Sequence, residues 1–300
     1  MMKIDFIVAG AAKSGTTSLF HYLNSHPRIF IPSVKECRFF SKLDKNFKGL
    51  GAEYYSNEGI TDDDDYRELF VGNEDKICGD ISNDYLYYST RSIENIKKYV
   101  GTQVKIIIIL RNPVERAFSS YMHHIREGWE VLSFREALEH EDQRFADNWG
   151  WTYHFKRAGL YSQSVKAYID NFNNIKIYTY EDLKHLDWLM SDVFSFLNVD
   201  QNIIDLHSKE KFNKSGRPRF RFINDLSNGR GRVANVIKPV VKKLMPTPLI
   251  SKIKRKIKNV NLVHESISYE DRNYLMDFYK DDICELEKII DRDLSGWLEK

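Results

Sequence analysis

A segment near the N-terminus, residues 10–17, combines two glycines with side chains that can hold an anion. Glycine allows sharp backbone turns, so that successive N–H groups and a helix N-terminus can converge on one phosphate. Lys13 adds positive charge, and three hydroxyls add hydrogen-bond donors. The pattern predicts a phosphate-binding loop. The residues expected to contact phosphate are Lys13, Ser14, Gly15, Thr16, Thr17 and Ser18.

The position of the lysine distinguishes this loop from that of the nucleoside triphosphatases. In their phosphate loop the lysine directly follows the second glycine, whereas here Lys13 precedes Gly15 and Thr16 follows it. The spacing therefore does not imply Mg²⁺-dependent cleavage of a triphosphate. A P-loop kinase or NTPase is kept as an alternative, and it would need a Mg²⁺-binding carboxylate after a strand, where Arg111 stands.

A second candidate for anion binding lies at residues 111–119. Arg111 ends an apolar run, and Pro113 stands where a helix can begin, because the first helical residue needs no N–H. Ser119 then falls about two turns along that helix. Since a guanidinium can grip a phosphate through paired hydrogen bonds, Arg111 and Ser119 are predicted to hold a second phosphate. Two such sites suit a donor that is phosphorylated at two positions.

Both candidates follow segments that are expected to be buried strands. Three short runs rich in β-branched residues, at 6–9, 104–110 and 175–180, are typical of parallel strands. A helical pattern follows each run, at 16–23, 114–125 and 183–197. The alternation predicts an α/β fold of P-loop type, with a central parallel sheet flanked by helices on both faces. Ligands bind such sheets at the carboxyl ends of the strands.

Composition excludes several classes of protein. The 300 residues are 42% hydrophobic, which is enough for a full core. Lys and Arg number 45 against 43 Asp and Glu, for a net charge of +2, so no nucleic-acid partner is expected from bulk charge. The sequence starts without a secretory pattern, has no run apolar enough to span a bilayer, and has three widely spaced cysteines. A cytoplasmic protein is expected.

One domain is predicted over residues 1–300. The Gly-, Asn- and Asp-rich stretch 47–65 is expected to form surface loops. A basic helical excursion is expected at about 230–262, where residues 238–258 either pack on the domain or contact an anionic membrane surface. Apolar residues at helical spacing from Leu275 to Ile290 predict a final helix docked on the core.

Together these motifs resemble the sulfotransferases that use 3′-phosphoadenosine 5′-phosphosulfate (PAPS), and most closely their bacterial and heparan sulfate type. Residues 10–17 resemble the family's 5′-phosphosulfate loop, and residues 111–119 resemble its 3′-phosphate motif. The likeness covers nearly the whole chain. Its further motifs lie at 25–27, 35–40, 128–130, 133–134, 157–161, 180–183, 213–217 and 293–297.

The resemblance implies a PAPS donor, PAP as the product, no required metal, and the following site. Glu36 is the general base that takes the acceptor proton, and Lys13 contacts the bridging or leaving-group oxygen. Further donor-binding residues are Tyr161, Lys214, Ser215, Gly216 and Arg217. Candidates for the acceptor site are Lys35, Arg38 and His123.

The sequence departs from the family in one motif. Several members carry Glu-Lys-Ser-Pro after a strand, whereas this chain has Ile81 and Asn83 at the lysine and proline positions. The motif therefore offers no second lysine here, and Asp80, Ser82 or Asp84 are candidates to line the acceptor site instead.

The function predicted from the sequence is sulfuryl transfer from PAPS to a hydroxyl, or alternatively an amine, of a saccharide or glycan. Trp129, Trp149, Trp151 and Tyr153 offer faces on which sugar rings stack. A small phenol, alcohol or lipid is the alternative acceptor. A degenerate nucleotide-binding protein is an alternative of another class. The motifs carry no signal for an oligomeric state.

Overall fold

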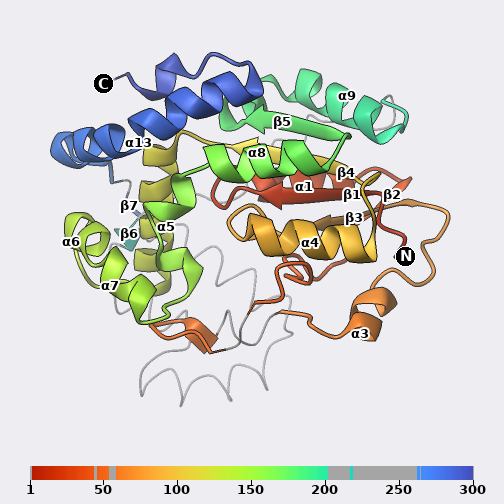
Figure 1. The fold of residues 1–300 in the computed structure, drawn as a ribbon, viewed down its shortest axis with the longest axis horizontal. Helices are drawn as coiled ribbons and strands as arrows, with labels where there is room; N and C mark the ends of the chain where they lie inside the picture. The colour runs from red at the N-terminus through yellow and green to blue at the C-terminus, as the bar shows by residue number, and fades with distance from the viewer. Residues whose placement is uncertain are drawn as a thin grey trace.

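A parallel sheet of five strands, in the order β2-β3-β1-β4-β5, forms the centre of the protein (Figure 1). The computed structural model describes residues 2–43, 46–53, 59–201, 217–218, 262–263 and 265–299. The strands are β1 (Phe6–Gly10), β2 (Ile29–Phe30), β3 (Ile77–Ile81), β4 (Lys105–Leu110) and β5 (Ile175–Thr179). The predicted α/β fold with a parallel central sheet is confirmed.

The three strands predicted from β-branched runs all form, and each ends within one residue of its predicted limits. β1 and β4 are buried because helices cover both faces of the sheet, whereas β5, at the edge of the sheet, is buried only at its last two residues. The structure adds β2 and β3 on the far side of β1. Asp80 and Ile81, expected near a strand end, are the last residues of β3.

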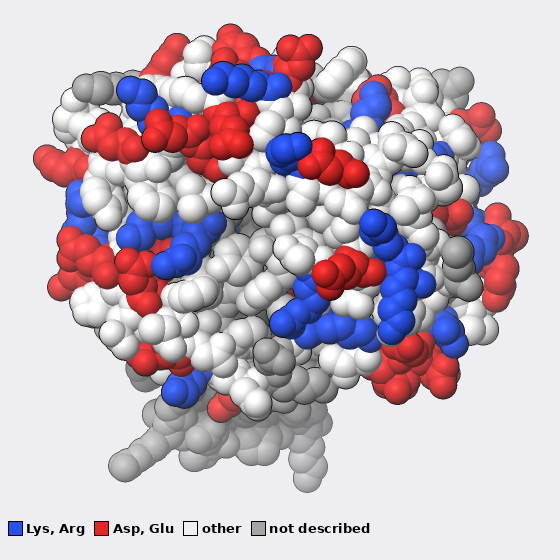
Figure 2. Space-filling model, in the orientation of Figure 1, with Lys and Arg blue, Asp and Glu red and all other residues white. Residues whose placement is uncertain are grey.

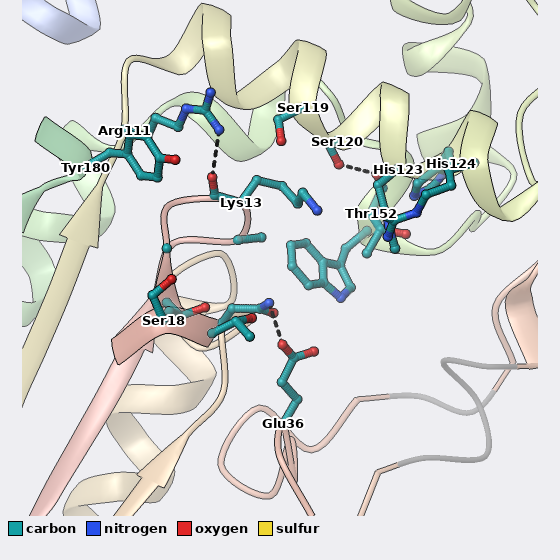
Figure 3. A pocket seen from close by; sticks show the side chains of 17 residues that line it. Lys13, Ser18, Glu36, Arg111, Ser119, Ser120, His123, His124, Thr152 and Tyr180 are labelled. Carbon is teal, nitrogen blue, oxygen red and sulfur yellow. Dashed lines mark hydrogen bonds between the residues drawn. The ribbon is translucent and has the colours of Figure 1, made fainter. Parts of the chain in front are cut away.

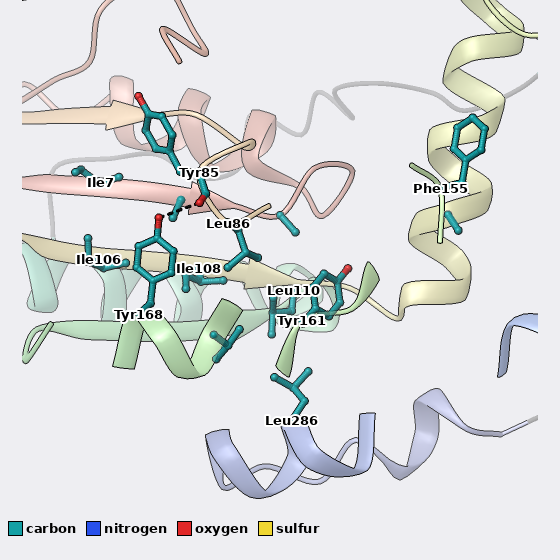
Figure 4. Packing of buried hydrophobic residues seen from close by; sticks show 14 of the residues in the cluster. Ile7, Tyr85, Leu86, Ile106, Ile108, Leu110, Phe155, Tyr161, Tyr168 and Leu286 are labelled. Carbon is teal, nitrogen blue, oxygen red and sulfur yellow. Dashed lines mark hydrogen bonds between the residues drawn. The ribbon is translucent and has the colours of Figure 1, made fainter. Parts of the chain in front are cut away.

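Side chains of successive strand residues enter opposite halves of the core. Ile106 and Ile108 of β4 pack with α4 (Ser89–Tyr99), α8 (Ser162–Asn171) and α13 (Tyr269–Ile290). Figure 4 shows both isoleucines on the side of the sheet that faces α8 and α13. Ile107 and Ile109 pack on the other face with α1 (Thr16–Asn24) and α9 (Leu186–Leu197). The predicted helices on both faces are therefore present.

Helix α5 (Pro113–Glu127) follows β4 and lies across the carboxyl ends of the strands (Figure 1). Asn112 caps it by accepting hydrogen bonds from the amides of Val114 and Glu115, and Pro113 occupies its first turn as predicted. The motif after β5 starts as a 3₁₀ helix, Tyr180–His185, before α9 begins. Two short helices, α6 (Phe134–Glu139) and α7 (Glu141–Ala146), follow α5.

Part of the segment predicted as surface loops is helical. Asp62 accepts hydrogen bonds from the amides of Asp64 and Asp65 and so caps α3 (Asp63–Glu68). A helix forms here because carboxylates in a first helical turn face the positive end of the helix dipole and stabilise it. Ala52 and Glu53 are also helical, and Lys48 forms an isolated bridge with Trp149. The other described residues of the stretch are irregular, as expected.

The C-terminal helix forms as predicted, as α13, and packs against α5 and α8. A two-stranded antiparallel ribbon of β6 (Arg217–Pro218) and β7 (Leu262–Val263) lies beside α5 (Figure 1). Most of the predicted basic excursion at 230–262, including all of 238–258, lies outside the described residues. Within the described part of the chain, no helix is long and apolar enough to cross a membrane. Basic and acidic side chains are mixed on the face drawn in Figure 2.

Candidate active site

A cavity of about 260 Å³ opens at the carboxyl ends of the strands, between the loop after β1 and helix α5 (Figure 3). It collects side chains from segments that are far apart in the sequence. Its lining residues are Ala12, Lys13, Gly15, Thr16, Thr17, Ser18, Glu36, Asn83, Arg111, Ser119, Ser120, His123, His124, Arg126, Trp151, Thr152 and Tyr180. Residues from the predicted phosphate loop, the predicted 3′-phosphate motif and the predicted base therefore meet in one place.

The loop between β1 and α1 can only be built with glycine at its two ends. Gly15 has φ +95°, and a Cβ there would lie 2.4 Å from Leu183 Cδ1. Gly10 has φ +149°, and a Cβ there would lie 2.9 Å from Leu86 Cβ and 3.1 Å from the Asn83 carbonyl oxygen. The loop thus leads directly into the first turn of α1, whose amide groups have no partner within the helix and can bind an anion.

Lys13 extends from this loop into the cavity (Figure 3). Burial, together with the nearby positive charges of Arg126, Arg111 and Lys35, lowers the pKa of its ammonium to about 7, although Glu36 opposes the shift. The cavity therefore gathers more positive than negative side chains in a poorly solvated place. Such an arrangement favours the binding of an anion, because an anion supplies the opposite charge.

Arg111 is held in position by several neighbours. Its guanidinium donates to the Lys13 carbonyl oxygen at 3.1 Å and lies 4.6 Å from the centre of the Tyr180 ring. Glu115 is 3.8 Å away. Tyr161 donates its hydroxyl to the Arg111 carbonyl oxygen at 3.1 Å. The guanidinium thereby bridges the two predicted phosphate motifs, and Ser119 faces the same cavity from α5.

Glu36 is the single carboxylate among the described residues that line the cavity. Its backbone has φ +65°, an uncommon value for a non-glycine residue, and its amide donates to the Ile81 carbonyl oxygen at 3.0 Å. The side-chain oxygen Oε1 accepts from Lys35 Nζ at 2.9 Å and from Asn83 Nδ2 at 2.8 Å. Lys35 Nζ also donates to Thr17 Oγ1 at 2.9 Å, so it connects the carboxylate to the phosphate loop.

Two residues predicted to contact the donor lie elsewhere. Ser14 is fully buried beneath the loop, and its hydroxyl does not line the cavity. Tyr161 lines an adjoining cavity of about 100 Å³, and its hydroxyl donates to the Arg111 carbonyl oxygen. In both cases the loop or strand backbone comes between the side chain and the cavity.

Four of the six acceptor-site candidates are buried outside the lining of the cavity. Asp80, Ser82, Asp84 and Arg38 are all at least 97% buried, and none lines the cavity. Asp80 accepts hydrogen bonds from the hydroxyls of Tyr66 and Tyr85, and Asp84 accepts one from Ser41. Burial raises the pKa of each carboxyl to about 6. Ser82 accepts a bond from the Arg38 amide.

Several lining residues are absent from the sequence prediction. Asn83 and Tyr180 lie inside recognised motifs but received no role there. On α5, Ser119, His123 and Arg126 follow one another at intervals of four and three, which is the repeat of one helix face. This spacing is the signal that identifies Arg126. His124 is fully buried at the cavity wall, and burial lowers its pKa to about 3, so its imidazole is neutral.

The aromatic residues expected to stack on sugars divide into two groups. Trp151 lines the cavity. Trp129 and Tyr153 belong to the hydrophobic core, and Trp149 packs against Arg144 and Tyr153. The expected stacking surface is therefore reduced to Trp151.

The remaining predicted donor residues are Lys214, Ser215 and Gly216, which lie outside the described residues, and Arg217, of which only the strand backbone is described. In the described part of the chain, no group of three or more His, Cys, Asp or Glu side chains could hold a metal ion.

Comparison with known proteins agrees with this geometry. The family model of the sulfotransferase domain matches residues 3–218. The crystal structure of a sulfotransferase from Alicyclobacillus acidocaldarius is 30% identical, with a TM-score of 0.76 and coverage of 100% of both chains.

Two curated relatives match over shorter stretches. The membrane-associated sulfotransferase kil1 of Dictyostelium discoideum is 33% identical over 41% of this chain and 23% of its own length. The human heparan sulfate glucosamine 3-O-sulfotransferase 5 is 28% identical over 38% of this chain and 29% of its own. The matched stretches thus span less than a third of each of these two relatives. The family model covers most of the chain and the bacterial structure all of it, so the chain belongs to the sulfotransferase family.

Proposed function

We propose that this sulfotransferase moves the sulfuryl group of PAPS to a hydroxyl of a saccharide. One observation carries the proposal: the phosphate loop, Arg111 with Ser119, and the single lining carboxylate Glu36 all face one cavity. A donor that is phosphorylated at two positions needs two phosphate-binding groups, and an acceptor hydroxyl that must lose a proton needs a base.

The residues present fit the proposed donor. The loop and the first turn of α1 suit the 5′-phosphosulfate, because backbone amides and Lys13 converge there. Arg111 and Ser119 suit the 3′-phosphate. Tyr180, which is 38% exposed and held beside Arg111, offers an aromatic face to the adenine. When bound, PAPS supplies a sulfuryl group on a phosphate that can leave.

The chain's own residues supply alignment and charge. Glu36 accepts the proton of the attacking hydroxyl as the new O–S bond forms. As the S–O bond to the 5′-phosphate breaks, negative charge builds on the phosphate oxygen, and the Lys13 ammonium stabilises it. Basic groups held in a poorly solvated cavity act strongly because they need no reorganisation during the reaction.

The acceptor class rests on weaker support than the donor. By its name, one relative acts on a glucosamine of heparan sulfate, and Trp151 offers this cavity an indole surface of the kind that packs on sugar rings. A phenol, alcohol or lipid, and an amine in place of the hydroxyl, are the alternatives. Incubation with sulfur-labelled PAPS and a panel of sugars, amino sugars, phenols and lipids separates them. Label only on phenols or lipids would contradict the saccharide assignment.

The 3′-phosphate assignment predicts a selective loss of affinity. We expect Ser119→Ala to weaken PAP binding by about tenfold, because a hydrogen bond to a charged phosphate is lost. Binding of 5′-AMP, which has no 3′-phosphate, should change by less than about twofold. Calorimetric titration of both nucleotides into both proteins provides the measurement. Equal losses for PAP and AMP would place Ser119 elsewhere in the site.

The lowered pKa of Lys13 predicts that donor binding takes up a proton. In the free protein, part of the Lys13 population is uncharged above pH 7, because its pKa is about 7. A bound phosphate favours the ammonium form and raises that pKa. The affinity for PAP should therefore fall as the pH rises above about 7.

Calorimetry near pH 8, in buffers with different ionisation heats, measures this uptake. It should be smaller in the Lys13→Met variant, which has no ammonium. Equal proton uptake in the variant and the wild type would assign the titration to another group.

The alternative of a P-loop kinase or NTPase is tested by the same titrations. The order of Lys13, Gly15 and Thr16 favours PAP over ATP with Mg²⁺. Tighter binding of ATP with Mg²⁺ than of PAP would support the alternative.

A further inference from the structure

A hydrogen-bonded clamp surrounds the carboxylate of Glu36. Its two donors, Lys35 Nζ at 2.9 Å and Asn83 Nδ2 at 2.8 Å, both bind the same oxygen, Oε1. Among the described residues, no side chain or amide donates a hydrogen bond to the second oxygen, Oε2. Since a carboxylate is planar, fixing Oε1 from two directions also fixes where Oε2 points.

Asn83 is itself held firmly against the phosphate loop. The amide of its neighbour Ser82 donates to the Val8 carbonyl oxygen at 3.2 Å. Its own carbonyl oxygen lies where a Cβ at Gly10 would be only 3.1 Å away, so the loop approaches it closely because residue 10 has no side chain. The side-chain amide of Asn83 is thus placed by the segment after β3, which is bonded to β1 and packs against the loop that carries Lys13.

Lys35 joins the clamp to the donor side of the cavity. Its ammonium donates to Thr17 Oγ1 as well as to Glu36. A hydroxyl that accepts from Lys35 keeps its own proton free to donate to a phosphate oxygen. The chain of contacts Thr17, Lys35, Glu36, Asn83 therefore ties the carboxylate to the groups that face the donor.

The backbone that carries Glu36 is strained and held in place. Glu36 has φ +65° and Arg38 has φ +57°, in the left-handed region that non-glycine residues seldom occupy. The segment is fastened at both positions, by the Glu36 amide to Ile81 and by the Arg38 amide to Ser82. Fixing the backbone leaves the side-chain rotamers of Glu36 to be selected by Lys35 and Asn83.

We propose that Asn83 and Lys35 are positioning residues that hold Oε1 of Glu36, so that Oε2 receives the proton of the acceptor hydroxyl. Ile81, at the position of the family's lysine, is buried in the core and offers no polar group to the cavity. Asn83, two residues later, supplies one instead. The inference rests on the proposed function, because it assigns a task to the base of that reaction.

A double-mutant cycle on transfer from sulfur-labelled PAPS tests the proposal. Asn83→Leu keeps the size of the side chain and removes the amide, and Lys35→Met keeps the chain length and removes the charge. We expect each to lower kcat by about tenfold, as for a displaced general base. Asn83→Leu should leave PAP affinity within about twofold, since its amide binds Glu36 and not a phosphate group.

The cycle separates positioning from a purely structural role. In the Glu36→Gln background, Asn83→Leu should cost less than about twofold further, because the group that it positions no longer acts as a base. An equal loss in both backgrounds would overturn the proposal. Asn83→Asp, which puts a carboxylate beside Glu36, should cost more than Asn83→Leu and provides a second variant if the leucine protein does not fold.

The matched control is Asn174→Leu. Asn174 directly precedes β5, and its side chain donates to the Gln103 carbonyl oxygen. It lies at the amino ends of the strands, whereas the cavity lies at their carboxyl ends. Its activity should equal that of the wild type. If the wild type is active and Asn83→Leu is equally active, this inference is overturned and the proposed function stands. If the wild type itself is inactive, both are overturned.

Discussion

Glu36→Gln should lower kcat for sulfuryl transfer by about 10²-fold or more while leaving the affinity for PAP nearly intact. The substitution keeps the size and the hydrogen-bonding shape of the side chain but removes the proton acceptor. No other described carboxylate lines the cavity, so no neighbour can take over the role. The loss should therefore appear in kcat, measured by initial rates, and not in donor binding, measured by calorimetry.

The same chemical change at Glu94 provides the control. Glu94 is an exposed residue of α4, remote from the lining of the cavity. Glu94→Gln should have wild-type kcat and PAP affinity. Unchanged turnover in Glu36→Gln would remove this carboxylate from the mechanism, and a large loss of PAP affinity would assign it to donor binding.

Lys13→Met should lower kcat by about 10²- to 10³-fold, which is the typical cost of removing a group that stabilises charge in a transition state. Lys13 extends into the cavity from the phosphate loop, and burial makes its charge effective. Unlike Glu36→Gln, this variant should also weaken PAP binding, by about tenfold, because the lysine faces the product phosphate as well.

Lys280→Met, on the exposed side of α13, is the control for the loss of one lysine charge. It should match the wild type in both assays. A Lys13→Met protein with normal kcat and weaker PAP binding would restrict Lys13 to ground-state binding.

The fold was largely predictable because its main signals are local. The run at 104–110 is apolar and β-branched, and it becomes β4 with a difference of one residue. β2 was missed because it has only two residues, and β3 because its sequence contains glycine and aspartate, which are uncommon in strands. The single-domain prediction for residues 1–300 stays a prediction, since the segment at 230–262 lies largely outside the described residues.

The site was predictable where backbone geometry itself binds the ligand. The glycines of the phosphate loop and the strand-to-helix passage at Arg111 leave their mark in the sequence, and both reach the cavity. Side-chain direction around residues 80–84 has no such signal. There Asn83 faces the cavity while Asp80 and Asp84 turn to buried hydroxyls. That choice depends partly on Tyr66 and Ser41, which come from other segments of the chain.

Function was predictable from the order of the motifs rather than from any one of them. The lysine displaced relative to Gly15 distinguishes the loop from that of the triphosphatases, and Arg111 stands where a Mg²⁺-binding carboxylate would be needed. The acceptor has no comparable signal, because Trp151 and His123, which also line the cavity, belong to no spacing pattern that points to one class of substrate.

The central claim is that this protein transfers a sulfuryl group from PAPS. A single-turnover experiment with sulfur-labelled PAPS, excess protein and a mixture of saccharide, phenol and lipid acceptors tests it most directly. The predicted result is label on a saccharide, with one PAP released for each label transferred. No transfer to any acceptor class, together with no PAP binding in calorimetry, would contradict the claim.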